Sequence, residues 1–505
     1  MSNSESNNQK ILFIFLFVSI PLFIGLAIWL AWWSVKNPKG VVVPQPTPSQ
    51  TSSGVSIATS SPSSSGVTSP VPTSSSDPQP VSTPTPFKTE DVQGRISFGE
   101  KSLIPQEAVS ETKQAGINAI ATKKWTEAID KLEELLKNKP NDPETRIFLN
   151  NAKIGDAKSY TIAVTVPLKN NLNGSLEILR GVAQAQHQIN SSQGNQRVPL
   201  KVAIASDDDD PEVAKQIATA LVNNPDVLGV VGHYASGVTL EAGQIYTAGQ
   251  LVAISPISTS VELSNFKPYI FRTVASDSVA AKKLADYMIK NIQQQKAAVF
   301  FNSKSKYSLS LKSEFIKAIK PTGQVVNEFD LSDLNFSAAD SVKTAMNNDA
   351  KVLMLAANTG TLDQALQVVT VNKKRLKLLG GDDVYAPKTL EIGGDDAVDM
   401  VVAVPWHIDN IRTAPFVSES RKLWGNVDVN WRTALAYDAT QALIAAINLD
   451  PSRNGVQQAL FSENLAIGAF DKVRFFKSGD RRDADVQLVK VVGDRTTGYK
   501  FEKMP

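Results

Sequence analysis

The stretch LGVVGHYASGVTLEAGQIYTAGQLVAISPISTSVELS, residues 228–264, decides the fold of this 505-residue chain. It holds two short apolar runs, 228–231 and 251–254, with a helical pattern between them, and this order predicts two buried parallel strands joined by a helix. Each run ends in a loop of small and hydroxylated residues. The carboxyl ends of parallel strands share one edge of a sheet, which is where open α/β sheets bind ligands. A helix N-terminus at the same edge would suit a small anion such as a carboxylate.

The composition narrows the class of protein. At 505 residues the chain is too long for a single hydrophobic core, so two or more domains are expected. Its 52 basic residues nearly balance 50 acidic ones and form no basic block, so nucleic acid is not expected as a partner. The absence of cysteine excludes disulfides, thiolate metal sites and a cysteine nucleophile. The three histidines are far apart and no glycine-rich nucleotide motif follows the first predicted strand, so neither a metal nor a cofactor is expected.

After an N-terminal tail (1–10), residues 11–33 read ILFIFLFVSIPLFIGLAIWLAWW, 23 residues without a charge. About 20 apolar residues span a bilayer, whereas the apolar region of a cleaved signal peptide has roughly 7–15. Three tryptophans at the end of the run are typical of a membrane interface. The segment therefore predicts an uncleaved transmembrane anchor. The flanking lysines lean weakly towards a cytoplasmic C-terminus, but large C-terminal domains often cross the membrane regardless, so the fold decides the orientation.

Residues 34–88 are rich in proline, serine and threonine and nearly free of charge. Such a composition cannot bury enough apolar surface to fold, which predicts a disordered linker.

Residues 89–157 form the next predicted segment, and 105–157 is strongly helical in pattern. The run WTEAIDKLEELLKNKPNDPE within it resembles a tetratricopeptide repeat. About one and a half repeats are present, fewer than the roughly three that stack stably. Two interpretations stay open: a TPR-like segment that binds a protein partner, or a helical hairpin that packs on the following domain.

From Tyr160 onwards the pattern changes to alternating strands and helices. Helices are predicted at 174–190, at 238–249, and at 211–222 behind an Asp-Pro cap. The alternation predicts a doubly wound α/β fold that is long enough for two lobes. Besides the two strands of the opening stretch, strands are predicted at 161–166, 200–205, 297–301, 325–329, 352–356 and 376–379.

Six segments in this order carry a resemblance to a known family. Residues 160–505 resemble the type I periplasmic binding proteins, specifically the branched-chain amino acid (leucine/isoleucine/valine) receptors of ABC importers. The segments are SDDDDPEVAKQIATALVNNPDVLGVVGHYAS, SPISTSVEL, YIFRTVASDS, LLGGDDVYAP, ALAYDATQALIAAI and GAFDKVRFFKSGDRR.

The resemblance implies a ligand-binding domain, 158–505, of two α/β lobes that close on a ligand. Three crossovers would join the lobes, at 271–276, 402–407 and 475–479. Lobe one would then contain 159–273 and 407–474, and lobe two 277–403 and 480–505.

The resemblance also implies which loops bind the ligand carboxylate. Tyr234 and Ser236 lie in the first loop, where a serine hydroxyl and a backbone N–H would bind it. Ile257, Ser258 and Thr259 form the second loop, which would add a carbonyl, a threonine hydroxyl and another N–H. Hydroxyls and N–H groups at a helix start can hold a carboxylate without a buried arginine. The alternative for Ser236 is an ordinary helix N-cap.

On the far lobe, the resemblance implies an acid that binds the ligand ammonium, at Asp382 or, one residue on, at Asp383. A carboxylate suits this role because a buried ammonium needs a paired charge; the alternative is an aspartate of a turn. Tyr307 matches a cleft tyrosine, and Tyr385 follows the acid. Where branched-chain receptors have two tyrosines, this chain has Asn358 and a threonine, which changes the wall near the ammonium.

Two other features are interpreted as structural. The run 207–210 of four aspartates lacks the spacing of a calcium loop and precedes a proline at a helix start, which indicates a cap. His233 lies beside Ser236, but no serine–histidine–acid order is suggested, so it is interpreted as a cleft-lining or structural residue.

The leading functional prediction is a non-catalytic receptor in the periplasm or otherwise outside the cytoplasm, tethered to the inner membrane. It would bind an amino acid or an amide-like ligand and deliver it to an ABC permease. The alternative is a ligand sensor or scaffold whose segment 105–157 recruits a partner. An enzyme is not expected, because the sequence shows no nucleophile–base pair or metal cluster.

Overall fold

The computed structural model describes residues 89–105, 109–191, 198–320, 322–410 and 412–505. The predicted tail, anchor and linker (1–88) lie outside the described residues. Within the described part of the chain, no helix is long and apolar enough to cross a membrane. Residues 84–505 form one compact unit, and the two lobes below belong to it.

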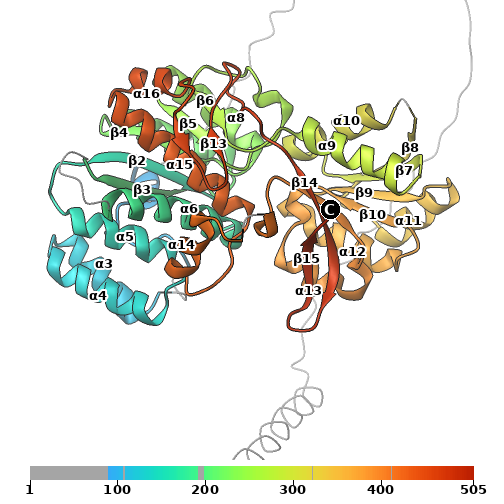
Figure 1. The fold of residues 1–505 in the computed structure, drawn as a ribbon, viewed down its shortest axis with the longest axis horizontal. Coiled ribbons are helices and arrows are strands. Elements are labelled where there is room, and N and C mark those ends of the chain that lie inside the picture. Colours follow the sequence, from blue (N-terminus) through green and yellow to red (C-terminus); the bar gives the residue numbers. More distant parts are fainter. Residues whose placement is uncertain (1–88, 106–108, 192–197, 321, 411) are drawn as a thin grey trace, which may run out of the picture. The chain divides into compact units, whose positions relative to one another are not determined.

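Lobe one is built on a six-stranded sheet with the order β1-β3-β2-β4-β5-β6 (Figure 1). Strand β1 runs antiparallel to β3, and the other neighbours are parallel. Helices α6 (Leu172–Ser191), α7 (Pro211–Asn223) and α8 (Ser236–Ala248) connect the parallel strands. The strands are β1 (Ile96–Ser97), β2 (Tyr160–Val166), β3 (Leu200–Ser206), β4 (Val227–Val231), β5 (Val252–Ser255) and β6 (Ile270–Arg272).

Lobe two is built on a seven-stranded sheet with the order β15-β14-β11-β10-β9-β7-β8 (Figure 1). Its central strands are parallel, while β14 and β15 add an antiparallel hairpin at one edge. The strands are β7 (Lys296–Phe301), β8 (Gln324–Asp330), β9 (Val352–Ala356), β10 (Lys377–Gly380), β11 (Val401–Val404), β14 (Gln487–Asp494) and β15 (Gly498–Lys503). The helices are α9 (Asp277–Asp286), α10 (Lys306–Ile319), α11 (Ala338–Asn347), α12 (Leu362–Asn372) and α13 (Pro387–Ala397).

After β11 the chain returns to lobe one and adds three helices, of which α15 packs along α6. The approach is close: a Cβ at Gly181 of α6 would lie 2.2 Å from the carbonyl oxygen of Thr433. Because α15 is buried over nearly its whole length, it carries its N-terminal residues into the interior next to the ligand loops. The three helices are α14 (Pro415–Leu423), α15 (Trp431–Leu449) and α16 (Arg453–Ala459).

The chain passes between the two sheets three times: after β6, after β11, and before β14. The first and third passages are hydrogen-bonded to each other, since Arg272 N donates to Gly479 O at 3.0 Å. The Arg272 guanidinium, almost fully buried, also lies 2.6 Å from Asp480 Oδ1. Gly479 has a φ of +84°, and a Cβ there would lie 2.2 Å from Ile270 O, so this contact requires glycine.

Segment 89–157 packs on lobe one. It contributes α2 (Thr89–Gly94) and the edge strand β1, neither of which was predicted, and then three helices. The third of these helices packs on α6 and β3, and the Asn151 amide donates to Phe98 O and Val202 O at 2.8 Å each. This supports the interpretation of the segment as helices that pack on the following domain. The three helices are α3 (Glu111–Ala121), α4 (Trp125–Asn138) and α5 (Pro143–Ile154).

The strands and helices predicted from apolar periodicity all form. Each strand lies within one residue of its predicted bounds, and each predicted α/β helix within two. Among the strands that were not predicted, β1 and β6 are short, and β14 and β15 are half-exposed. Strand β11 is a buried apolar run, and the prediction of 402–407 as the second crossover is wrong for its residues 402–404. The half-exposed strands have weak patterns because only a strand that is buried on both faces forms a continuous apolar run.

Candidate ligand-binding site

The first ligand loop lies between β4 and α8. Ser236 is the first residue of α8, and the N-cap is Ala235, whose side chain forms no cap hydrogen bond. The alternative interpretation of Ser236 as the N-cap is therefore wrong. Its buried hydroxyl accepts a hydrogen bond of 3.2 Å from Ser260 N instead. The first N–H groups of a helix have no partner within it, so the uncapped start of α8 can receive an anion.

The second loop, after β5, is cross-linked to the first. The Ser258 hydroxyl lies 2.7 Å from Thr239 Oγ1 and donates to Tyr234 O at 3.0 Å. The Ser255 hydroxyl donates to His233 O at 2.8 Å and accepts from Ser258 N. The Ser258 hydroxyl is thus used within the protein, and the two loops hold each other in place.

Thr259 is different from its neighbours. Its Oγ1 is buried and has no hydrogen-bond partner among the described residues. Its carbonyl accepts hydrogen bonds from the Arg272 guanidinium at 2.9 Å and from Asp277 N at 2.8 Å. A buried hydroxyl without a partner is unfavourable, so this group is available to a ligand.

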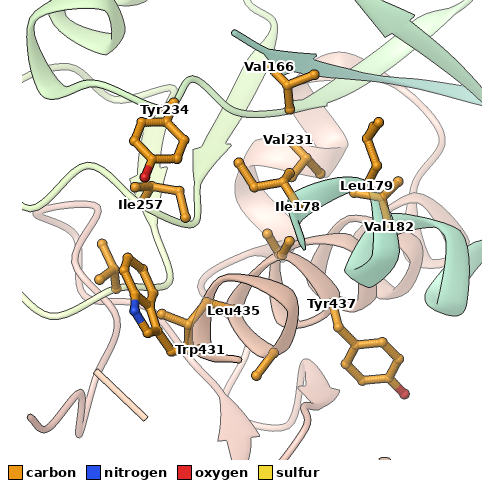
Figure 2. Packing of buried hydrophobic residues seen from close by; sticks show 14 of the residues in the cluster. Val166, Ile178, Leu179, Val182, Val231, Tyr234, Ile257, Trp431, Leu435 and Tyr437 are labelled. Carbon is orange, nitrogen blue, oxygen red and sulfur yellow. The ribbon is translucent and has the colours of Figure 1, made fainter. Parts of the chain in front are cut away.

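Ile257 also belongs to the second loop, and its side chain is buried. Figure 2 shows it beside Tyr234, with Trp431 and Leu435 of α15 close by. These four residues belong to one cluster of buried apolar side chains. The cluster includes a residue of each ligand loop, so both loops are packed against the apolar core.

In lobe two, Tyr307 and Asp382 form a buried pair. Tyr307 is in the first turn of α10, and its hydroxyl donates to Asp382 Oδ1 at 2.6 Å. Asp382 follows β10, in the short 3-10 helix η5 (Asp382–Val384). Burial, and secondarily the neighbouring Asp383, raises the pKa of Asp382 to about 7. Ionised Asp382 is therefore unfavourable in this site until a cation arrives.

Asp277 is a site residue that the sequence analysis missed. It begins α9 directly after the first passage between the sheets, and it is buried. Its Oδ2 has no hydrogen-bond partner among the described residues. Burial raises its pKa to about 7, and the charge of Asp382 contributes to the shift. The one signal in the sequence was an acid directly after a predicted crossover.

Asp383 has a different set of partners. Its Oδ1 accepts hydrogen bonds of 3.1 Å from both Tyr234 Oη and the guanidinium of Arg432. Its Oδ2 accepts from Thr359 N at 3.0 Å and from the hydroxyl of the same residue. These four bonds fill the acceptor sites of a carboxylate. Of the two adjacent acids, only Asp382 is left to bind a ligand cation.

Arg432 is the second residue that the sequence analysis missed. It lies in the first turn of α15, is 5% exposed, and also donates to Tyr234 Oη at 3.0 Å. Its guanidinium stacks over Trp431, with 4.3 Å to the ring centroid. No sequence pattern signals it, because an arginine at a helix start is usually exposed.

The remaining predicted residues have partners within lobe two. The Asn358 side chain accepts hydrogen bonds from Asn302 Nδ2 at 2.8 Å and from Thr361 Oγ1 at 2.9 Å. The ring of Tyr385 packs against Phe501 at a centroid distance of 4.4 Å. Neither side chain forms a hydrogen bond with Tyr307 or Asp382.

The four aspartates at 207–210 divide into separate roles. Asp210 is the N-cap of α7, as predicted, and accepts from Glu212 N and Val213 N. Asp207 lies 2.5 Å from Nδ1 of His233, whose Nε2 lies 3.0 Å from Tyr246 Oη.

In the described ranges no group of three or more acids or histidines could hold a metal ion. His233 is thus a buried structural residue beneath the first ligand loop.

The site has two parts of opposite charge preference, called its poles below. The uncapped start of α8, with the hydroxyls of Ser236 and Thr259, can receive a carboxylate. The buried acids Asp277 and Asp382 can receive a cation. Asp277 N donates to Thr259 O, so the two poles are adjacent.

Comparison with known proteins identifies the family. A model of the family described as "Periplasmic binding protein" matches residues 160–496, more than half of the chain. The chain belongs to this family of periplasmic binding proteins. Its two-lobed fold with parallel sheets is the type I form, and the family consists of solute-binding receptors rather than enzymes.

The relatives of this periplasmic binding protein include amino acid receptors. A leucine-specific-binding protein of Salmonella typhimurium is 24% identical over 283 residues, covering 55% of this chain and 75% of the relative. An amino acid binding protein of Pseudomonas aeruginosa is 30% identical over 121 residues, which is 24% of this chain and only 32% of that protein. The crystal structure of a leucine binding protein from Thermotoga maritima has a TM-score of 0.59 at 20% identity, covering 68% of this chain and 97% of that one.

Proposed function

We propose that this protein is an extracytoplasmic solute-binding protein of an ABC importer that binds an amino acid or a similar small polar ligand between its lobes. The ligand carboxylate binds at the start of α8, to Ser236 and to the loop of Ile257, Ser258 and Thr259. The ligand ammonium binds between Asp277 and Asp382.

One observation carries this proposal: a buried hydroxyl that can bind a carboxylate lies next to a buried acid that can bind an ammonium. Neither the hydroxyl Oγ1 of Thr259 nor the carboxylate Oδ2 of Asp277 has a hydrogen-bond partner of good geometry among the described residues, and both atoms are buried. The two side chains are close together, because the Thr259 side chain, like that of Ser310, lowers the pKa of Asp277 against the larger effect of burial, and one backbone hydrogen bond also joins the two residues. Buried polar atoms in proteins are nearly always hydrogen-bonded. A zwitterion satisfies both groups at once, since its ammonium compensates the acid and its carboxylate accepts from the hydroxyl and the helix N–H groups.

Tyr307 orients the acid of this site through its hydrogen bond to Asp382. Tyr234, Tyr385 and Asn358 contribute by holding the surrounding loops, Tyr234 through Asp383 and Asn358 through Asn302. The names of the relatives agree with an amino acid as ligand.

The proposal includes a tether and a transport partner. The apolar run at 11–33 anchors the protein in the inner membrane, and the binding domain delivers its ligand to an ABC permease. Protease accessibility of the linker at 34–88 in spheroplasts tests the topology, because protection of that linker contradicts an extracytoplasmic domain.

A sensor or scaffold is the second candidate, and helix α4 favours it. Only four of its 14 residues are buried, so much of its surface is free of contacts with lobe one. In this function α3 and α4 recruit a protein partner when lobe one responds to ligand. Retention of full transport after disruption of the exposed face of α4 favours the importer.

The decisive experiment is a thermal-shift screen of the full-length protein with the twenty amino acids, amides and urea. A ligand that binds the folded state raises the melting temperature. Ser236→Ala and Asp382→Asn should each abolish most of that shift, whereas Asp395→Asn, at an acid that is 84% exposed, should leave it unchanged. An unchanged shift in both site variants would show that the ligand binds elsewhere.

A further inference from the structure

A network of hydrogen bonds joins the two lobes next to the proposed site. It joins Tyr234 and Arg432 of lobe one to Asp383 and Thr359 of lobe two. Arg432 donates to both Tyr234 Oη and Asp383 Oδ1, and Tyr234 Oη itself donates to Asp383 Oδ1. Asn171 of lobe one extends the network through a bond of 3.4 Å to Thr359 Oγ1.

The network is nearly saturated. Asp383 accepts four hydrogen bonds, and Arg432 adds bonds to the carbonyl oxygens of Tyr385 at 3.3 Å and Asp382 at 3.5 Å. The side chains of Arg432 and Asp383 are 6% and 11% exposed. Within the protein Asp383 uses all its acceptor sites and Arg432 four of its five N–H donors, so the network acts as a wall.

The wall adjoins both poles of the site. Tyr234 precedes Ser236 by two residues on the carboxylate loop, and Asp383 directly follows the ammonium acid Asp382. A ligand that binds at both poles has its α-carbon between them. The network contacts the residues of both poles, since Arg432 donates to Asp382 O at 3.5 Å and the Ser258 hydroxyl donates to Tyr234 O at 3.0 Å.

We propose that the Tyr234–Arg432–Asp383–Thr359 network closes the side-chain end of the cleft and makes the protein select amino acids with short side chains, namely glycine, alanine and serine, against leucine, isoleucine and valine. This inference rests on the proposed function, because it takes the two poles as the anchors of the ligand.

The physical reason is the cost of separating a buried ion pair. A branched hydrocarbon side chain at this end would have to displace Tyr234 or Asp383 and leave Arg432 without its counter-charge. An uncompensated buried charge is strongly unfavourable, and the hydrocarbon offers no hydrogen bond in return. Short side chains avoid this cost.

Isothermal titration of the full-length protein with glycine, alanine, serine, leucine, isoleucine and valine tests the inference. The tightest of the short-chain ligands should bind at least about tenfold more tightly than any branched one, which is the scale of discrimination in a shaped pocket. Equal or tighter binding of a branched ligand overturns the inference but leaves the proposed function standing. Binding of none of these six amino acids overturns the inference, and the proposed function falls only if no compound of the thermal-shift screen binds either.

The double variant Arg432→Leu/Asp383→Val removes the charges together and replaces them with apolar side chains. The ratio of the leucine Kd to the alanine Kd should fall at least about tenfold. The matched control is Arg481→Leu/Asp438→Val, a buried pair at 2.6 Å that also involves α15. This control should change stability but not the ratio.

If the double variant does not fold, Tyr234→Ala provides the same readout, because it removes the aromatic part of the wall without separating the ion pair. A Kd ratio that is unchanged in the folded variant overturns the inference.

Discussion

The guanidinium of Arg432 lies 3.1 Å from the carboxylate of Asp383, and this ion pair joins helix α15 of lobe one to the loop after β10 of lobe two. The contact resolves an ambiguity between two adjacent aspartates. Asp383 is neutralised by the protein, whereas the carboxyl of Asp382 receives one side-chain hydrogen bond, from Tyr307, within the described chain. Tertiary packing therefore decides which of two chemically identical residues faces a ligand.

The buried pair should be sensitive to the loss of one partner. Arg432→Ala leaves Asp383 without its charge partner and should lower the free energy of unfolding by about 3–5 kcal/mol. Urea denaturation followed by circular dichroism measures the change. Lys306→Ala is the control: its pair with Glu262 also bridges the lobes, but both side chains are about half exposed, so a loss of about 1 kcal/mol or less is expected. Equal losses in the two variants would contradict the proposed burial.

The stability of the ligand-free protein should fall as the pH rises. Burial raises the pKa of both Asp277 and Asp382 from 3.8 to about 7, so the folded state binds more protons than the unfolded state between these values. The contribution of each group to stability is complete below its unfolded pKa and is lost as the pH rises through about 7. The variant Asp277→Asn/Asp382→Asn should flatten the pH dependence of the unfolding free energy between pH 4 and 7. Part of the slope should persist, because burial also raises the pKa of Asp209 to about 7. An unchanged slope would show that Asp277 and Asp382 do not contribute to it.

Ligand binding should show the opposite pH dependence. An ammonium group pairs with ionised acids, so its binding releases protons from Asp277 and Asp382 and strengthens as the pH rises from about 5.5 to 8. Titration calorimetry in two buffers of different ionisation enthalpy measures the protons released. An affinity that weakens over this range would exclude a cation at these two acids.

Gly479→Ala should destabilise the contact between the first and third passages of the chain. The φ of +84° opposes any side chain, and so does the carbonyl oxygen of Ile270, which would lie 2.2 Å from a Cβ at this position. We expect a loss of about 1–3 kcal/mol in the free energy of unfolding. Gly493→Ala, where a Cβ would meet nothing within 4 Å, is the matched control and should change stability little. A neutral Gly479→Ala variant would mean that the passages separate easily.

The attachment of α5 to lobe one should depend on Asn151. Asn151→Ala removes two hydrogen bonds to carbonyl oxygens and should cost about 2–3 kcal/mol, because the buried carbonyls lose their partner. Hydrogen exchange of the β1 and β3 amides reports the local effect. Asn138→Ala, at an exposed site on α4, should leave these amides protected as before. Unchanged exchange in both variants would show that α5 is held by other contacts.

Periodicity in the sequence was sufficient for the parallel strands and their helices. Strands such as β4 and β9 are buried on both faces, so their residues form continuous apolar runs that stand out from the loops. The half-exposed hairpin of β14 and β15 lacks such a run, and its strands become visible only through their pairing with β11. A continuous apolar run in the sequence indicates a strand that is buried on both faces. A half-exposed strand that is held by pairing with its neighbour has no such run.

The site, like the fold, has one part that the sequence predicts and another that depends on tertiary packing. The hydroxyl-rich loops after β4 and β5, with the helix between them, follow from residues 228–264 alone, because neighbouring parallel strands place their carboxyl ends together. The partners Asp277 and Arg432 lie far away in the chain, and only the passages between the sheets and the packing of α15 bring them to these loops. The sequence by itself determined an anion-binding edge on an α/β sheet, since strand order and helix polarity are local properties. Only the tertiary structure decided which acids remain free and which are neutralised, because charge pairing depends on which distant side chains are buried together.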